Sequence, residues 1–303
     1  MLVLGATGFV GKTVCELLTS KGLEFHRTSL TTGVDLRDAD QTNKLFEETN
    51  PDYVLNCASY VGGIQFGYEH PAEIFRNNLL MTVNIIEACH RQNVRRIINP
   101  VSNCVYPGQA TLFREDEIWD GPLHESVMVY GMARKMSWIG AWAYHQQYGT
   151  DTINLVPPNI YGPGDHFDPV RSHALGALIK KMVDAKKNAD PSVPVWGTGK
   201  PVREWMYIED GAEALIRALD IEPYLGPINI GVGEGVSIAD LARMIKDEVG
   251  YQGEIRFDMS KPDGATHKTL DGARGEKLLG WKPQITLPDG IRKTVQWYYE
   301  NVG

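Results

Sequence analysis

The sequence has few of the features that assign a chain quickly to a class of proteins. Its four cysteines, Cys15, Cys57, Cys89 and Cys104, match neither a disulfide framework nor a metal-binding pattern. We therefore expect free thiols, no bound metal and a reducing compartment. No apolar run is long enough to cross a membrane, and the chain does not open on a basic, apolar leader. These features predict a cytoplasmic protein with no membrane partner.

Positive charge is also scarce. The 38 acidic residues outnumber the 30 lysines and arginines, which leaves a net charge of −8. Basic residues cluster only in pairs such as Arg95-Arg96, which the apolar Ile97-Ile98 follows at once. A broad electrostatic surface for nucleic acid is therefore excluded. An anionic substrate would have to be bound by individual cations.

The first half of the chain alternates short, β-branched runs with longer amphipathic stretches. Such alternation is typical of a doubly wound parallel sheet, the Rossmann type of α/β fold. We expect strands at 2–4, 53–56, 96–101 and 152–156, and helices at 10–20, 40–48, 72–91 and 125–148.

The pattern changes after Pro157-Pro158-Asn159. Loops rich in glycine and proline surround a predicted helix at 173–185 and predicted strands at 193–196 and 204–208. We expect residues 1–158 to form a dinucleotide-binding domain. Residues 159–303 would form mainly a smaller α/β substrate-binding domain, with segments near 203–232 as candidates to return to the first domain.

A glycine-rich loop follows the first predicted strand and opens the first predicted helix. Gly5, Gly8 and Gly11 are spaced to allow a tight turn, a close approach of backbone to a pyrophosphate, and helix–strand packing. A glycine triplet alone is weak evidence, but its position between strand and helix favours dinucleotide binding. The predicted cofactor-binding residues of this loop are Gly5, Thr7, Gly8, Phe9, Val10 and Gly11.

The end of the second predicted strand indicates which dinucleotide binds. An acidic residue there would bind the ribose 2′-hydroxyl of NAD, but the chain has Arg27, Thr28 and Ser29. A cation and two hydroxyls suit a 2′-phosphate, which favours NADP(H). The alternative is that Arg27 is an ordinary surface charge. Asp35 and Leu36 are expected beneath the adenine.

Tyr130 and Arg134 are four residues apart in a predicted helix, so they share one face. A phenol can donate a proton to a ketone that receives hydride, and a neighbouring cation favours the phenolate that results. Arginine keeps its proton, unlike lysine. Lys135 is rotated by about 100° around the helix and is not expected to substitute. Without the other motifs, Tyr130 would be read as a half-buried aromatic residue.

Several further motifs resemble one enzyme family. The glycine loop, Tyr130 and the segment from Ser102 to Pro107 together resemble an extended short-chain dehydrogenase/reductase. Stretches along almost the whole chain narrow the resemblance to the GDP-L-fucose synthases, the GDP-4-keto-6-deoxymannose 3,5-epimerase/4-reductases. These stretches are Val61-Gly62-Gly63-Ile64, Asn159-Ile160-Tyr161-Gly162-Pro163, Ser172-His173, residues 195–204 and Lys261-Pro262-Asp263-Gly264 with Lys268.

The resemblance implies a role for each matching residue. Ser102 would hydrogen-bond the C4 carbonyl, Tyr130 would donate the proton, and Arg134 occupies the position of a lysine that binds the nicotinamide ribose. Cys104 and His173 would be the acid–base pair that inverts C3 and C5, since both residue types titrate near neutral pH when perturbed. The implied substrate-binding residues are Trp196, Arg203 and Lys268.

The resemblance also implies a homodimer, built by the helices at 72–91 and 125–148. The second of these has an apolar stripe that includes Met128, Met132, Met136 and Trp142, which ordinary core packing would also explain.

Other functions remain open on the sequence. A relative could act on another nucleotide sugar, such as a 4-keto heptose or a colitose precursor, or reduce C4 without epimerisation. Cys104 and His173 speak against the last. A non-catalytic NADP-binding sensor is favoured mainly by Arg134. An epimerase or dehydratase that retains NAD is disfavoured by the missing acid after the second strand.

Overall fold

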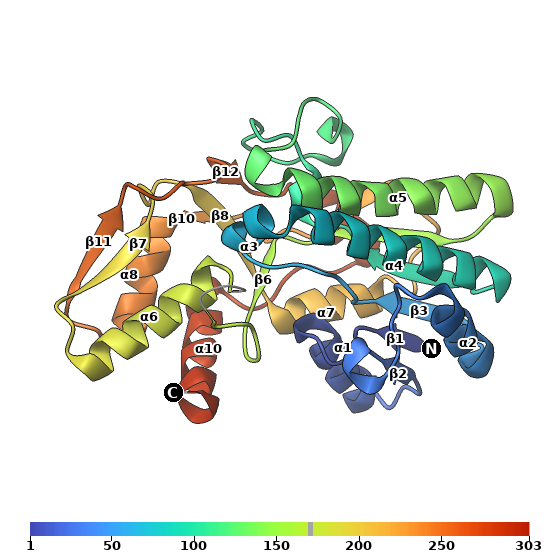
Figure 1. Ribbon diagram of the computed structural model, residues 1–303, viewed down its shortest axis with the longest axis horizontal. Coiled ribbons are helices and arrows are strands. Elements are labelled where there is room, and N and C mark those ends of the chain that lie inside the picture. The colour runs from blue at the N-terminus through green and yellow to red at the C-terminus, as the bar shows by residue number, and fades with distance from the viewer. Residues whose placement is uncertain (169–171, 303) are drawn as a thin grey trace.

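The computed structural model describes residues 1–168 and 172–302, and its centre is a parallel six-stranded sheet (Figure 1). The strand order is β2-β1-β3-β4-β5-β9. The strands are β1 (Leu2–Leu4), β2 (His26–Thr28), β3 (Tyr53–Asn56), β4 (Arg96–Pro100), β5 (Thr152–Val156) and β9 (Pro227–Asn229). The predicted doubly wound parallel sheet is confirmed, with β4 ending one residue earlier than expected.

Helices cover both faces of this sheet. In Figure 1, α4 and α5 run side by side above it, and α1 and α7 lie below it. The helices of this part are α1 (Phe9–Ser20), α2 (Ala39–Thr49), α3 (Ile64–Glu69), α4 (Pro71–Arg91), α5 (Met128–Tyr148) and α7 (Ile208–Arg217). Helix α5 begins three residues later than predicted, because Glu125–Val127 forms a separate 3-10 turn.

Alternating residues of β1 explain why both faces are covered. Val3 packs with Val14 of α1, whereas Leu2 and Leu4 pack with Phe46 of α2 on the opposite face. Successive side chains of a strand point to opposite faces, so an entirely apolar strand needs a layer on each side.

The strand order reverses between β1 and β3, which creates a crevice at the carboxyl edge of the sheet. Ligands of open α/β sheets bind at such a point. The loops after β1 and β3 touch there, since a Cβ on Gly5 would be 2.7 Å from the backbone nitrogen of Ala58. Gly5 has a φ of 71°, so it supplies both the turn and the close approach.

The second part of the molecule is organised around β8 (Val202–Tyr207). Its first half pairs with β10 and β12, and its second half pairs with β6, while β7 and β11 form a separate parallel pair. The other strands are β6 (Asn159–Tyr161), β7 (Ser192–Trp196), β10 (Gly235–Ser237), β11 (Glu254–Asp258) and β12 (His267–Lys268). Its helices are α6 (Ala174–Asn188), α8 (Ile238–Val249), α9 (Ala273–Leu279) and α10 (Leu287–Asn301).

An apolar core holds this second part together. Leu178 and Met182 of α6, Leu241 of α8 and Tyr298 of α10 belong to one apolar cluster with Trp205 of β8. The register of β12 on β8 sets Lys268 directly beside Arg203. Two cations that are far apart in the sequence therefore become neighbours.

The four cysteines are free thiols in the structure. Across residues 1–168 and 172–302, no helix is long and apolar enough to span a membrane, and no group of three metal-ligating side chains occurs.

Candidate active site

The turn after β4 carries a strained residue. Ser102 has a φ of 84°, a conformation that costs a non-glycine residue about 1–3 kcal/mol and is concentrated at functional sites. Its hydroxyl oxygen accepts the backbone N–H of Cys104 at 3.3 Å and so caps the short 3-10 helix Asn103–Val105. This turn holds Ser102 and Cys104 at the carboxyl edge of the sheet.

Helix α5 packs directly on this turn. A Cβ on Gly131 would lie 2.3 Å from the carbonyl oxygen of Cys104, so only glycine allows this approach. The contact brings the neighbouring Tyr130 to the turn. The Tyr130 hydroxyl is 3.2 Å from the hydroxyl of Ser59, in the loop after β3. Sequence reasoning missed Ser59, although it lies just beyond the carboxyl end of a parallel strand, where ligands bind.

Arg134 and Lys135 have different environments. Arg134 is 5% exposed, and its Nη2 donates to the carbonyl of Pro100 at the end of β4. Its Nε is buried without a hydrogen-bond partner among the described residues. Lys135 donates to the Ile118 carbonyl at 2.8 Å and lies 4.1 Å from the ring centre of Trp119. As predicted, Lys135 does not take the position of Arg134.

Two predicted cations from separate parts of the chain, Lys268 and Arg203, act on Cys104, and Lys268 also acts on His173. Lys268 is 8% exposed, and its ammonium donates to Cys104 Sγ at 3.6 Å. The charge of Arg203 acts on Cys104, and the charge of Lys268 acts on His173. Asn103, which was not predicted, accepts the thiol hydrogen at 3.7 Å. Positive charge is therefore concentrated where the sulfur would become negative.

His173 and Arg203 differ in their protonation. His173 precedes α6, and burial lowers its pKa, with the charges of Lys268 and His166 adding to the effect. The imidazole is therefore neutral at neutral pH and able to accept a proton. Burial lowers the pKa of Arg203 to about 10, against the charges of Cys104 and Asp263. The guanidinium remains charged at neutral pH.

Glu204 is a buried residue of the site that the sequence analysis did not single out. Its carboxylate accepts backbone N–H groups from Val232, from Gly233 at 3.0 Å and from Leu270 at 2.6 Å. Burial raises its pKa to about 7, while the three N–H groups act in the opposite direction. The carboxylate ties β8 to two distant loops and so fixes Arg203. The sequence signal that could have identified Glu204 is an acidic residue in a predicted strand of apolar residues, because a buried acid needs hydrogen-bond partners.

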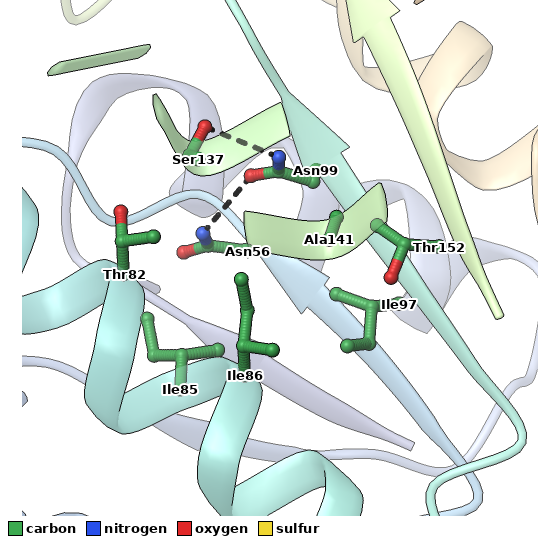
Figure 2. Close-up of a pocket in the computed structure, with 9 residues that line it drawn as sticks. All are labelled: Asn56, Thr82, Ile85, Ile86, Ile97, Asn99, Ser137, Ala141 and Thr152. Atoms are coloured by element: carbon green, nitrogen blue, oxygen red, sulfur yellow. Dashed lines mark hydrogen bonds between the residues drawn. The ribbon is translucent and has the colours of Figure 1, made fainter. Parts of the chain in front are cut away.

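A polar network lies behind the site, inside the sheet. Asn99 of β4 donates to Asn154 of β5 at 2.9 Å and to Ser137 of α5 at 3.3 Å, and accepts from Asn56 of β3 at 3.4 Å. Figure 2 shows three of these residues at a small cavity of about 10 Å³. Asn56 in turn accepts the backbone N–H of Ala58. The network therefore fixes the loop of Ser59 relative to the helix of Tyr130.

The glycine loop is suited to a pyrophosphate. A Cβ on Gly11 would lie 2.2 Å from the carbonyl oxygen of Gly5, so α1 can approach the loop only with glycine there. Gly8 caps α1 without a side chain, which leaves the first N–H groups of the helix without a side-chain acceptor. Such a helix end attracts anions. Phe9 and Val10 begin the helix and pack against the core of the second part.

A cluster of hydroxyl groups lies beside this loop. The Thr7 hydroxyl donates to Ser29 at 2.9 Å and contacts Thr31 at 2.8 Å. Arg27 is exposed on β2, and its charge reaches Cys15 of α1, whereas Thr28 is buried. These groups fit a 2′-phosphate. Thr31 was not predicted, although it follows the same strand.

The two residues predicted beneath the adenine have other contacts of their own. The Asp35 carboxylate binds Arg37 Nε and Nη2 at 2.7 and 2.6 Å, which holds the pKa of Asp35 below its usual range. Leu36 is buried in the same cluster as Phe46, and its carbonyl accepts hydrogen bonds from Thr42 at 3.3 Å and from Asn84 at 3.0 Å.

Trp196 is a surface residue rather than a core residue. It is 44% exposed at the end of β7. The ammonium groups of Lys181 and Lys261 lie 5.5 and 5.3 Å from its ring centre. The ring and two cations form a platform that suits an anionic, planar ligand.

The fold and this arrangement of residues define an enzyme of the extended short-chain dehydrogenase/reductase type. The chain belongs to the NAD dependent epimerase/dehydratase family, whose model matches residues 1–231, and within it to the GDP-L-fucose synthases. It is 35% identical over 304 residues to probable GDP-L-fucose synthase 1 of Oryza sativa subsp. japonica, covering 100% of this chain and 92% of that protein. It is 33% identical over 311 residues to the Escherichia coli (strain K12) GDP-L-fucose synthase, covering 99% and 97%.

Two solved structures are similar over nearly the whole chain. A GDP-6-OMe-4-keto-L-xylo-heptose reductase from C. jejuni has a TM-score of 0.91 at 28% identity, covering 99% of this chain and 97% of that one. A GDP-L-fucose synthetase from Naegleria fowleri bound to NADP has a TM-score of 0.90 at 30% identity, covering 99% and 92%.

Proposed function

We propose that this protein is an NADPH-dependent 3,5-epimerase/4-reductase of a GDP-linked 4-keto sugar, of the type that converts GDP-4-keto-6-deoxymannose to GDP-L-fucose. The observation that carries the proposal is that Lys268 contacts Cys104 and its charge also acts on His173, while helix α5 with Tyr130 packs on the turn that holds Ser102 and Cys104. A site for ketone reduction alone has no need of Cys104 and His173. The names of the related proteins support the same substrate class.

The reductase half of the site uses Ser102, Tyr130 and Arg134. Bound NADPH supplies the hydride. The Ser102 hydroxyl binds the C4 carbonyl oxygen, and the Tyr130 hydroxyl donates a proton to that oxygen as it becomes an alkoxide. The buried guanidinium of Arg134 is a fixed positive charge one turn from Tyr130, and its free Nε is a donor for the cofactor ribose.

The epimerase half uses the acidity of the positions next to the ketone. A carbanion at C3 or C5 delocalises into the C4 carbonyl, so a base can remove a proton and an acid can return one to the opposite face. Cys104 and His173 are the two groups, and Lys268 and Arg203 supply positive charge near the sulfur. Arg203, Lys268 and Trp196 also bind the diphosphate-linked part of the substrate.

A heptose is the second candidate substrate. The TM-score of 0.91 with a GDP-4-keto-heptose reductase favours it. The additional carbon of a heptose requires a different pocket shape, and such a pocket distinguishes the two sugars by about 1–3 kcal/mol of binding free energy.

Incubation with GDP-linked 4-keto sugars and NADPH tests the proposal. We expect loss of absorbance at the reduced-nicotinamide band, and deuterium from solvent at C3 and C5 of the product. GDP-4-keto-6-deoxymannose and a GDP-4-keto-heptose should be compared, with dTDP- and UDP-linked ketones as controls. Tight NADP binding without turnover of any ketone would favour the sensor function instead.

The pH dependence of epimerisation follows from the environment of His173. Its pKa is lowered, so the neutral imidazole persists below the ordinary histidine range. If the neutral form accepts the proton, the rate of C3/C5 exchange falls only at a pH below that range. We expect the acidic limb of a pH–rate profile of solvent exchange to lie below about 6.5. An acidic limb above that value would contradict this assignment.

We also infer a homodimer formed by α4 and α5. Their common outer face exposes a group of large apolar side chains, namely Phe75, Leu80, Val83, Met128, Met132, Met136 and Trp142. Helices that lie side by side with such a face are suited to a four-helix interface with a second copy.

Met132→Glu is expected to convert the dimer to monomer at micromolar concentration, because a buried carboxylate at the interface would have no partner. Sedimentation velocity measures the change. Met259→Glu is the matched control, since Met259 is exposed on another part of the surface. If the parent protein is itself a monomer in this measurement, the inferred homodimer is wrong.

The domain division remains part of the proposal. Residues 1–158 bind the dinucleotide, with help from segments at 203–232, and the rest binds the sugar. The strand β9 and the helix α7, which belong to the first sheet and its layers, support this division. The four free thiols support a location in the cytoplasm.

A further inference from the structure

The proton donor of the reductase site has a hydroxyl partner that the proposed roles leave unused. The oxygen atoms of Tyr130 and Ser59 are 3.2 Å apart, and either can be the donor. Tyr130 is half-buried, whereas Ser59 is exposed. The serine hydroxyl therefore connects the phenol to solvent.

The two cations of α5, Arg134 and Lys135, cannot carry a proton from solvent to Tyr130. Arg134 has only donors, does not give up a proton, and is hydrogen-bonded to the Pro100 carbonyl. Lys135 is directed to Ile118 and Trp119. After Tyr130 has donated its proton, the phenolate needs another source.

Ser59 is held in position by Asn78 of α4. The Asn78 carboxamide is buried and uses both of its ends on the Ser59–Tyr60 backbone region. Its oxygen accepts the Tyr60 N–H at 3.0 Å, and its nitrogen donates to the Tyr60 carbonyl at 2.8 Å and to the Ile74 carbonyl at 2.8 Å.

The same oxygen offers a second acceptor to the Ser59 hydroxyl. The distance from Ser59 Oγ to Asn78 Oδ1 is 3.4 Å, which makes a weak bond. The single proton of Ser59 can therefore turn between Asn78 and Tyr130 while the oxygen stays fixed. A hydroxyl with this freedom is able both to accept and to donate a proton.

We propose that Ser59 is the proton relay that restores Tyr130 after each turnover, an inference that rests on the proposed reductase function. When C4 has gained hydride, the carbonyl π electrons move to its oxygen. The Tyr130 O–H bond breaks, and its proton forms the new hydroxyl of the sugar. Ser59 then gives its proton to the Tyr130 oxygen and takes one from a water molecule at its exposed side. The water is left as hydroxide, which the buffer neutralises, so the cycle consumes one solvent proton for each ketone reduced.

Transient kinetics of Ser59→Ala tests the relay. Stopped-flow absorbance would follow NADPH oxidation with GDP-4-keto-6-deoxymannose in excess. In the variant the first turnover should keep the parent rate, since Tyr130 starts protonated, and the following turnovers should be about tenfold or more slower. A burst of one NADPH per active site results. Imidazole in the buffer should restore the steady-state rate by delivering a proton directly, and Ser59→Thr should behave like the parent.

Two controls separate the relay from a structural role. Ser260→Ala removes another exposed hydroxyl, one bonded to Asp258, and should leave both phases unchanged. If Ser59→Ala slows the first turnover as much as the later ones, changes only KM, or changes nothing, then Ser59 is not the relay. If the parent protein itself does not oxidise NADPH with any nucleotide-linked ketone, the proposed function is wrong. This outcome differs from failure of the relay, which is seen only when Ser59→Ala is compared with an active parent protein.

Discussion

Tyr130→Phe is expected to lower kcat for ketone reduction by about 10²–10⁴-fold, the range that a positioned general acid contributes. The phenyl ring keeps the shape of the side chain and loses only the hydroxyl group that donates the proton. The approach of α5 to the turn at Gly131 does not involve the hydroxyl, so the fold and the cofactor site should persist. Stopped-flow and steady-state measurements of NADPH oxidation give the size of the loss.

Two further measurements make this result specific. Deuterium exchange at C3 and C5 should continue in Tyr130→Phe, because Cys104 and His173 remain. Tyr148→Phe is a matched control, since Tyr148 is an exposed residue at the end of the same helix. A reduction rate within a few-fold of the parent value in Tyr130→Phe would mean that another group donates the proton.

The sequence predicted the central sheet well because local patterns determine it. The strand Leu2–Leu4 is apolar on both faces, and the glycine loop follows it at once. Helix α5 was predicted three residues too long at its start. Glu125–Val127 forms a 3-10 turn directly before the helix, and the sequence pattern does not distinguish such a turn from the first turn of an α-helix.

The second part was harder to predict because its strands pair across long sequence separations. Strand β8 contacts β6, β10 and β12, and only the last of these pairings brings Lys268 beside Arg203. The contact between Lys268 and Cys104 spans 164 residues. No periodicity in one segment encodes such a contact. The roles of Cys104 and His173 were therefore predicted from a family resemblance, and not from the residues themselves.

Ser59 and Glu204 show two different reasons for a missed residue. Ser59 meets Tyr130 only after the sheet has formed, across 71 residues. A serine in a loop has no distinctive pattern. Glu204 stood in a strand pattern as an unexplained charge. A fully buried acid must have partners, and the structure supplies them as backbone N–H groups from distant loops, which no local pattern indicates.

Cys104→Ala is expected to lower inversion at C3 and C5 by at least about 10²–10⁴-fold, while ketone reduction continues. The thiol is one of the two groups in the proposed acid–base pair, and alanine leaves no group to exchange a proton on the face opposite His173. The cations of Lys268 and Arg203 remain to bind the substrate. The sugar formed should then keep its original configuration at C3 and C5, which proton NMR of the product detects.

Cys15→Ala is the matched control, because it removes a buried thiol of α1 that has no part in the site. Exchange should be unchanged in this variant. The Lys268 ammonium lies 3.6 Å from the Cys104 sulfur, and the charge of Arg203 acts on the same residue. We therefore expect Lys268→Met also to lower the rate of inversion at C3 and C5. The rate of ketone reduction should fall by a smaller factor. Inversion at C3 and C5 that persists at the parent rate in Cys104→Ala would show that His173 acts with a different partner, and the proposed epimerase pair would be wrong.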